Sequence, residues 1–308
     1  MYQSVLHPTL YTPASMSPDK LTALVNNDHP GLGIWRIVIC TEDSIKEDEV
    51  DVALENIAKM LSGMAEGSRI CTFIRVRNQR ILGRLLELDL VDRLDGFVVP
   101  KADPADFTDY ADQLHGTNFK LLPIMESDGI RDRHFRDALR AIFDDAAYRN
   151  FIDCVRIGGN DLMGQLGIRR PVHTHTIYDT PVGATIHELI NEFQGLSGFP
   201  VTAPVFECFA PKYDDLFRKE VQQHIANGLF GQTVISPRHL RPLRDMYKVP
   251  LADIDSARSV LEHERAVIGK HGRMDEYTTH HQWAKKIIAR HHLFGDDETS
   301  QTLRDLIG

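Results

Sequence analysis

Charged side chains recur in this sequence immediately after short apolar runs that predict buried strands. Carboxylate oxygens without histidine or cysteine suit Mg²⁺, which takes one or two carboxylates and leaves other positions to water and substrate. An arginine opposite the metal would neutralise a substrate carboxylate or a developing enolate. These residues are Glu42, Asp43, Arg75, Arg77, Lys101, Glu126, Asp161 and Glu207.

Residues 151–167, FIDCVRIGGNDLMGQLG, hold one such carboxylate at a predicted strand-to-helix junction. The apolar first half predicts a buried strand, and Gly158 and Gly159 allow the backbone to turn sharply. Asn160 and Asp161 follow directly, and a helical period then begins. Binding sites of α/β proteins lie at such junctions, although an N-cap role would also explain Asp161.

Eight apolar runs of strand character alternate with amphipathic stretches along the chain. This order and the length of 308 residues predict a (β/α)8 barrel, in which the residues after each strand gather at the C-terminal mouth. A doubly wound sheet would show the same alternation, but no GxGxxG fingerprint is present. The runs are residues 6–10, 32–40, 69–76, 94–99, 119–125, 151–157, 199–206 and 230–236.

The composition excludes several other classes of protein. A hydrophobic content of 42% and a charged content of 26% are ordinary for a soluble globular protein. The net charge of −9 argues against nucleic acid as the main partner. No apolar run is long enough for a membrane span, no signal peptide is evident, and the four dispersed cysteines indicate reduced thiols. We therefore expect a cytoplasmic protein.

Several segments, in order along the chain, resemble the citrate lyase β-subunit/HpcH–HpaI aldolase superfamily of Mg²⁺-dependent carbon–carbon lyases. The chain is most similar to a divergent branch described as C–C bond lyases of the barrel fold, which is associated with tellurite-resistance gene clusters. The similarity covers roughly residues 6 to 250. The motifs are LYTPASMSPDKL (10–21), Glu42-Asp43, IRVRN (74–78), DGFVVPK (95–101), LLPIMES (121–127), GGNDLMGQLG (158–167) and GQTVISP (231–237).

The resemblance implies roles for the charged residues. Glu126 and Asp161 would hold Mg²⁺, and Arg75 would stabilise the enolate, with Arg77 as the alternative arginine. Glu42 and Asp43 would hold metal-bound water. The substrate, a 2-oxo or 2-hydroxy acid or an acyl-CoA, would be bound by Arg77, Lys101, Gly158, Gly159 and Asn160.

Other interpretations stay open at this point. Cys40 and Ser236 occupy positions that are usually polar in the family, which favours a non-catalytic ligand-binding or scaffold barrel. A pyruvate-type aldolase that does not use coenzyme A is a further alternative. Lys101 could instead pair with a barrel carboxylate, and Glu207 could line the mouth. Arg169–Arg170 is expected to lie in a solvated loop.

The end of the chain carries no strand signal after Val260, so we predict a barrel over residues 1–258 and a helical extension over 259–308. Apolar residues recur there at helical spacing, and an amphipathic helix must bury that face. Family members form trimers or hexamers, so the resemblance implies a homo-oligomer, a trimer or a multiple of it, with residues 272–277 near a barrel mouth. The residues are Trp283, Ile287, Ile288, His291 and Phe294.

Overall fold

The computed structural model describes residues 2–171, 174–262 and 266–297. The chain forms two compact units, Met1–Leu240 and Arg241–Gly308, which we describe separately. The sequence-based boundary after residue 258 lies inside α11 (Leu251–Glu262) of the second unit. The extents predicted for the barrel and its extension stay predictions.

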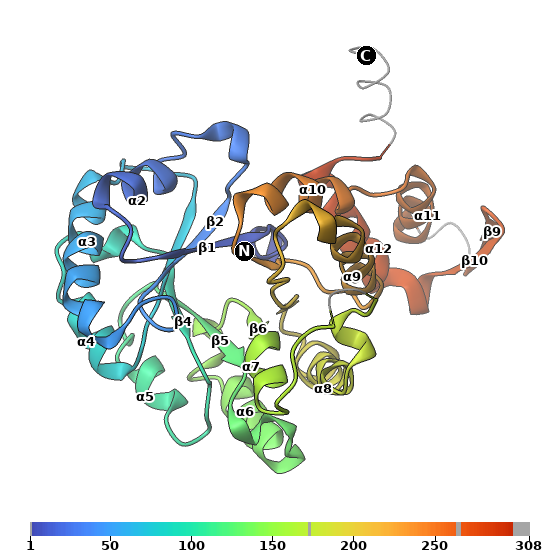
Figure 1. Ribbon diagram of the computed structural model, residues 1–308. Coiled ribbons are helices and arrows are strands. Elements are labelled where there is room, and N and C mark those ends of the chain that lie inside the picture. The colour runs from blue at the N-terminus through green and yellow to red at the C-terminus, as the bar shows by residue number, and fades with distance from the viewer. Residues whose placement is uncertain (1, 172–173, 263–265, 298–308) are drawn as a thin grey trace. The chain divides into compact units, whose positions relative to one another are not determined.

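The first unit is built around eight parallel strands, which confirms the predicted (β/α)8 barrel (Figure 1). They lie in the order β7-β6-β5-β4-β3-β2-β1-β8. The ring closes where the Ala203 amide donates to the Phe230 carbonyl at 2.9 Å and the Thr233 amide donates to the Ala203 carbonyl at 3.3 Å. The strands are β1 (Thr9–Pro13), β2 (Arg36–Cys40), β3 (Cys71–Arg75), β4 (Gly96–Val99), β5 (Lys120–Met125), β6 (Val155–Ile157), β7 (Val201–Thr202) and β8 (Thr233–Val234).

The strand sequences are mostly apolar at consecutive positions because both faces of the sheet are buried. One face points into the barrel, where the register places Tyr11, Val38 and Phe73 side by side on β1, β2 and β3. The other face packs against the surrounding helices. The buried interior cluster consists of Val5, Val38, Phe73, Val98, Leu122, Ile124 and Cys154.

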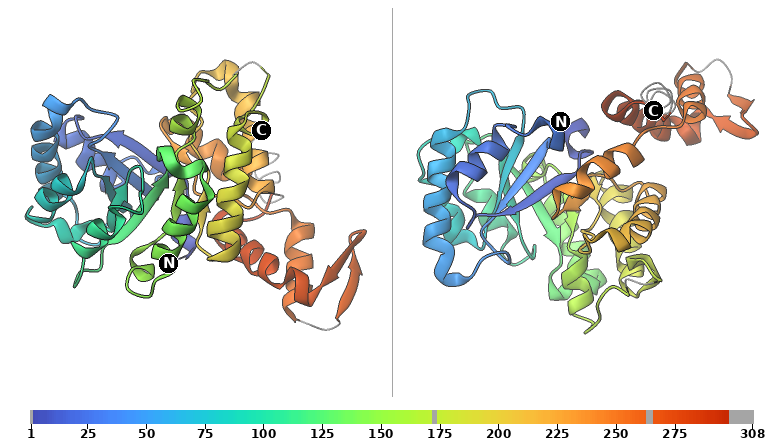
Figure 2. Two further views of the ribbon diagram at one scale, coloured as in Figure 1. Left: turned by 90° about the horizontal axis from the view of Figure 1, so that it is seen from below. Right: turned by 45° about the horizontal axis from the view of Figure 1, so that its top comes forward.

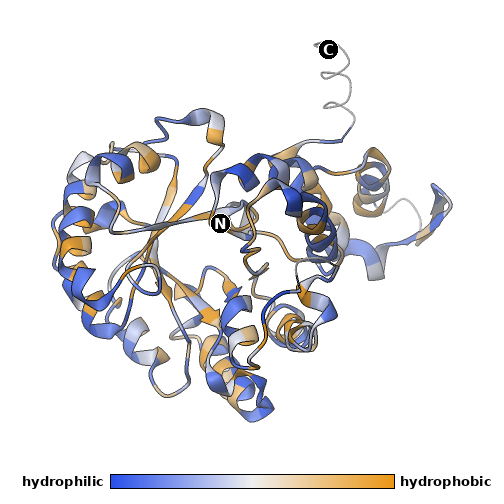
Figure 3. Ribbon diagram, in the orientation of Figure 1, coloured by the Kyte–Doolittle hydropathy of each residue, from blue (hydrophilic) through white to orange (hydrophobic). Residues whose placement is uncertain are grey.

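Helices follow the strands and carry polar residues together with apolar ones, as Figure 3 shows. Two of them begin at side-chain caps: the Asn78 side chain accepts from the Ile81 amide, and Asp132 accepts from His134 and Phe135. A π-helix, η7 (Ile190–Leu196), directly continues one helix. The helices are α1 (Tyr2–Val5), α2 (Pro18–Val25), α3 (Val50–Gly63), α4 (Gln79–Leu86), α5 (Phe107–Asp112), α6 (Arg133–Asp144), α7 (Gly159–Gly164), α8 (Val182–Leu189) and α9 (Asp214–Ala226).

The second unit contains strands, so the prediction of none after Val260 was wrong. β9 (Val267–Lys270) and β10 (Arg273–Glu276) form an antiparallel hairpin, coloured orange-red in Figure 2. His271 and Gly272 take positive φ values of 50° and 72°, as a two-residue hairpin turn requires. The strands are largely exposed, so they lack the apolar alternation that predicts a strand.

The predicted C-terminal helix is α12 (Tyr277–Phe294), and its apolar face is covered within the second unit. Ala284 and Ile287 pack with residues of α11, with Trp283 and Ile288 at the edge of the cluster. That face therefore does not by itself require another subunit, and the homo-oligomer stays a prediction. α10 (Leu240–Met246) leads from the first unit into the second. No helix of the described residues is long and apolar enough to cross a membrane.

Candidate active site

The last residue of β3, Arg75, lies at the centre of a cluster of carboxylates. One guanidinium nitrogen, Nη2, is 2.7 Å from Glu42 Oε2, 3.1 Å from Asp43 Oδ2 and 2.9 Å from Glu126 Oε1. Glu42 and Asp43 follow β2, and Glu126 follows β5. The C-terminal ends of three strands thus meet at one cation, as the barrel prediction requires.

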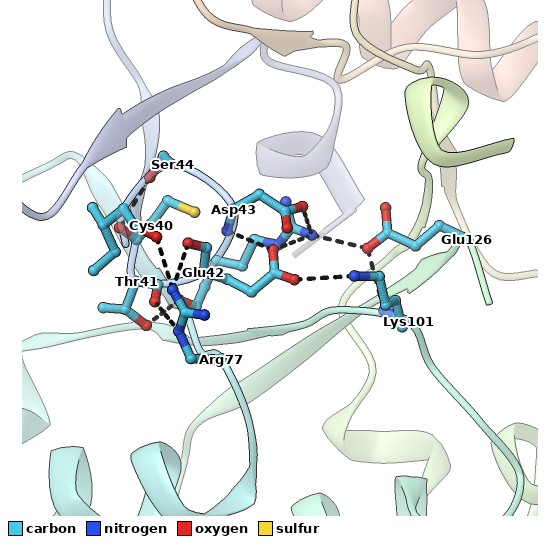
Figure 4. Close-up of polar contacts among 10 residues, drawn as sticks. Cys40, Thr41, Glu42, Asp43, Ser44, Arg77, Lys101 and Glu126 are labelled. Carbon is cyan, nitrogen blue, oxygen red and sulfur yellow. Dashed lines mark hydrogen bonds and ion pairs between the residues drawn. The ribbon is translucent and has the colours of Figure 1, made fainter. Parts of the chain in front are cut away.

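Lys101 joins this cluster from the end of β4. Its backbone amide donates to Glu126 Oε1 at 3.2 Å, and its Nζ lies 3.4 Å from Glu42 Oε1 (Figure 4). Its φ of 47° is unusual for a residue other than glycine. Such backbone strain persists where the surroundings fix it, and here the Glu126 carboxylate holds the Lys101 amide. The expected pairing of Lys101 with a barrel carboxylate is present.

Arg77, in contrast, binds the backbone of the loop after β2. Its Nε donates to the Thr41 carbonyl at 3.2 Å, and its Nη2 donates to the carbonyls of Glu42 and Ile45 at 3.1 and 2.8 Å. Figure 4 shows Arg77 on the Thr41 side of the cluster. Arg75 is therefore the arginine that contacts the carboxylates, and Arg77 fixes the loop that carries two of them.

Glu126 and Asp161 line one cavity of about 810 Å³. Asp161 lies in the first turn of α7, and its carboxylate has neither a hydrogen-bond donor nor an ion-pair partner in the described part of the chain. The N-cap of α7 is Gly158, so Asp161 is not the cap that its position could have explained. The cavity is lined by Lys101, Asp103, Glu126, Ser127, Asp128, Gly129, Asn160, Asp161, Gly164 and Gln165.

Gly158 and Gly159 allow close packing at the floor of this region. A Cβ on Gly158 would lie 2.1 Å from Glu126 Oε2, so only glycine leaves space for that carboxylate. A Cβ on Gly159 would lie 2.8 Å from Ile177 Cδ1 and 2.9 Å from Pro204 Cβ. Both glycines thus shape the backbone that presents Asn160 and Asp161.

The electrostatics of the cluster favour an additional cation. Burial raises the pKa of Glu126 to about 7; the charge of Arg75 opposes this, whereas Asp161 and Glu42 add to it. Burial also raises the pKa of Glu42, against the opposing charge of Arg75. Four carboxylates, Glu42, Asp43, Glu126 and Asp161, face two cations, Arg75 and Lys101, so −4 + 2 leaves a formal charge of −2.

The residues present fit Mg²⁺ better than a metal that needs a full protein cage. No group of three or more histidine, cysteine or acidic residues among the described residues could hold a metal ion. Mg²⁺ is usually bound through one or two carboxylates and keeps several waters. Asp161 forms no ion pair with any residue that the structure describes, and the Oε2 of Glu126 is not the oxygen that Arg75 contacts.

Two further sequence-based expectations can be compared with the structure. Arg170 was expected in a solvated loop, which was wrong: its side chain is buried and forms ion pairs with Glu207 and with Glu220 Oε2, the latter at 3.1 Å. The Glu207 carboxylate is therefore engaged in an ion pair with Arg170. Sequence reasoning missed Gln165 as a cavity residue, although it lies one helical turn after Asp161.

Comparisons with known proteins agree with this architecture. The citrate lyase β-subunit-type protein CitE of Mycobacterium tuberculosis, solved with magnesium, acetoacetate and coenzyme A, superposes with a TM-score of 0.66 at 16% identity, covering 93% of this chain and 98% of that chain. Malate synthase of Haloferax volcanii gives 0.63 at 14% identity, covering 83% of this chain and 84% of that one. RipC of Yersinia pestis gives 0.59 at 17%, covering 82% and 99%. At these identities the likeness establishes the fold.

No curated protein sequence matches this chain significantly. A family model does, and it spans nearly the whole sequence, residues 1–296. Its description, a C–C bond lyase of the TIM-barrel fold, agrees with the observed barrel and with the resemblance seen in the motifs. The chain therefore belongs to the family of C–C bond lyases of the TIM-barrel fold.

Proposed function

We propose that this chain is a Mg²⁺-dependent carbon–carbon lyase or aldolase that cleaves or forms a bond in a 2-oxo or 2-hydroxy acid or an acyl-CoA. The observation that carries the proposal is the Asp161 carboxylate, which has no ion-pair partner among the described residues and lies beside the cluster of Glu126, Glu42 and Asp43 on Arg75. This cluster keeps an excess negative charge at the mouth of a lyase-family barrel.

In this proposal Glu126 and Asp161 would hold the Mg²⁺. When bound, Mg²⁺ supplies a Lewis acid that polarises an oxygen of the substrate. Arg75 would stabilise the negative charge that develops on enolate formation. Lys101 and Asn160, which line the cavity, would bind a substrate carboxylate, and Glu42 and Asp43 would orient water through hydrogen bonds.

A separate, apolar groove of about 500 Å³ bears on whether the substrate is a coenzyme A thioester or a free acid. Tyr11 and Pro13 of β1 and Ile235, which follows β8, line it together with Lys20. An acyl or pantetheine chain fits such a lining, and the similar CitE protein of M. tuberculosis was solved with coenzyme A. A pyruvate-type aldolase would leave this groove unused.

The test is metal binding measured by calorimetry. Glu126→Gln and Asp161→Asn should each weaken Mg²⁺ binding by roughly 10- to 100-fold or more, because each removes one of two charged ligands. Asp103→Asn is the matched control, since Asp103 lines the same cavity and its Oδ1 accepts a bond from the Ala105 amide that asparagine can keep. Unchanged Mg²⁺ affinity in both ligand variants would refute the assignment.

A non-catalytic ligand-binding or scaffold barrel is the second candidate. Cys40 favours it, because this position at the end of β2, usually polar in the family, holds a buried thiol beside the cluster. Turnover decides between the two. Cleavage of any acyl-CoA or 2-oxo acid that is lost in Asp161→Asn would exclude the scaffold.

A further inference from the structure

Two side chains join the segments that carry Glu126 and Asp161. Arg131 ends the short helix η4 (Asp128–Arg131) after β5, and it reaches across to α7. Its Nη1 donates to Gln165 Oε1 at 2.5 Å, and its Nη2 donates to the Leu162 carbonyl at 2.5 Å. The Gln165 amide nitrogen in turn donates to the Glu126 carbonyl at 2.7 Å. The connection thus runs from α7 back to the backbone of Glu126.

We call the contacts made by the Arg131 and Gln165 side chains the bridge. A buried arginine fixes the backbone that carries Arg131. Arg136, in the first turn of α6, donates from Nη1 to the carbonyls of Ile130 and Arg131 at 3.0 and 2.8 Å. Its Nε lies 3.0 Å from both carboxylate oxygens of Glu192. Glu192 belongs to the π-helix η7, a rare element that is frequent at functional sites. Arg131 is therefore held at two points: its side chain contacts Gln165 and Leu162, and its backbone carbonyl accepts a hydrogen bond from Arg136.

The bridge contacts α7 next to the candidate ligand. Leu162 directly follows Asp161, and Gln165 lies one helical turn further on. A displacement of α7 would break the contacts of Arg131 and Gln165 and would move Asp161 relative to Glu126. The distance between the two carboxylates therefore depends on these hydrogen bonds of 2.5 to 2.7 Å.

We propose that Arg131 and Gln165 are positioning residues that fix the separation of Glu126 and Asp161 and thereby favour Mg²⁺ over Ca²⁺. Mg²⁺ demands near-ideal octahedral geometry with bonds of about 2.0–2.1 Å, whereas Ca²⁺ accepts flexible geometry at about 2.3–2.6 Å. If the separation of the Glu126 and Asp161 carboxylates becomes variable, the affinity for Mg²⁺ should therefore fall more than the affinity for Ca²⁺. This inference rests on the proposed function, because it requires that the two carboxylates bind a cation.

The experiment measures the dissociation constants of Mg²⁺ and Ca²⁺ by calorimetry for Arg131→Met and Gln165→Met. Mg²⁺ affinity should fall about 10-fold or more and Ca²⁺ affinity much less, so their ratio changes. Arg133→Met is the matched control, since Arg133 lies two residues away, is exposed and pairs only with Asp137 in the described structure. The Gln165 side chain is also exposed, so Gln165→Met leaves the core intact.

A second readout needs no metal. Hydrogen exchange of the amides of residues 127–131 and 159–167 should accelerate in metal-free Arg131→Met but not in Arg133→Met. An unchanged Mg²⁺-to-Ca²⁺ ratio in folded Arg131→Met and Gln165→Met overturns the positioning role and leaves the metal assignment intact. Wild-type protein that binds no Mg²⁺ overturns the proposed function itself.

Discussion

Replacing Gly158 by alanine is a direct probe of the Glu126 carboxylate that leaves every charge in place. Gly158 directly follows β6 and is the N-cap residue of α7, and its backbone lies against the Glu126 side chain. Its φ is −91°, so the left-handed conformations that only glycine tolerates are not involved. The methyl group, and not the backbone conformation, is the perturbation.

The size of the displacement follows from the distances. The added Cβ would lie 2.1 Å from Glu126 Oε2 and 2.5 Å from Glu126 Cβ, whereas real Cβ contacts below 3.0 Å essentially never occur. The separation between the new Cβ and the oxygen must therefore grow by at least 3.0 − 2.1 = 0.9 Å, and its separation from Glu126 Cβ by 0.5 Å. Overpacking of this kind costs about 1–3 kcal/mol of stability. A shift of nearly 1 Å is large for Mg²⁺, so we expect its Kd to rise by about 10- to 100-fold.

Titration calorimetry with Mg²⁺, together with thermal unfolding, measures both effects. Gly164→Ala is the matched control, because Gly164 ends the same helix, lines the same cavity and has nothing within 4 Å of an added Cβ. Gly164→Ala should bind Mg²⁺ as the wild type does. The reasoning fails if folded Gly158→Ala keeps the wild-type affinity, or if Gly164→Ala loses as much.

Two further predictions concern the stability of the first unit. Arg170→Met leaves the buried carboxylate of Glu220, and that of Glu207, without their cation and should cost about 3–5 kcal/mol in urea unfolding. Arg170→Met/Glu220→Leu should recover part of this loss, because Glu207 still lacks its cation; a double variant as unstable as the single one would contradict this. Burial lowers the pKa of His224 from 6.5 to about 3, so the imidazole stays neutral in the native state. The unfolded chain binds a proton at this histidine below pH 6.5, so the free energy of unfolding should fall by about 2 kcal/mol between pH 7 and 5. His224→Gln should lose less over that range, and an identical pH dependence in both proteins would show that another group is responsible.

The sequence predicts the barrel and the positions of the cluster because both follow from local order along the chain. Each strand is a buried apolar run, and in a barrel the residue after each strand reaches the same end, so Glu42, Lys101 and Glu126 could be assigned to one mouth. Which arginine contacts the carboxylates could not be predicted. Arg75 and Arg77 flank Val76 and are two residues apart, so they would share a face of an extended strand, but β3 ends at Arg75 and the chain then turns.

Long-range pairing explains the other differences. The ion pair of Arg170 with Glu220 joins residues 50 positions apart, and nothing in the sequence around Arg170 indicates burial. The apolar face of α12 is visible in the sequence, but the sequence does not show that it packs against α11. The hairpin of β9 and β10 depends on the turn at His271 and Gly272, whose flanking strands are too polar to be recognised by apolar alternation.

The arrangement around Arg75 is easier to understand as a binding site than as a stabilising ion pair. A buried guanidinium needs one or two carboxylates, and a third partner on the same nitrogen adds repulsion among the acidic groups. Burial raises the pKa of Glu126, and repulsion from Asp161 and Glu42 adds to this effect. Within the described residues the Asp161 carboxylate has no hydrogen-bond donor or ion-pair partner, although Lys101 and Asn160 line the same cavity. A divalent cation between Glu126 and Asp161 would offset the excess charge, so the electrostatics support the proposed metal site.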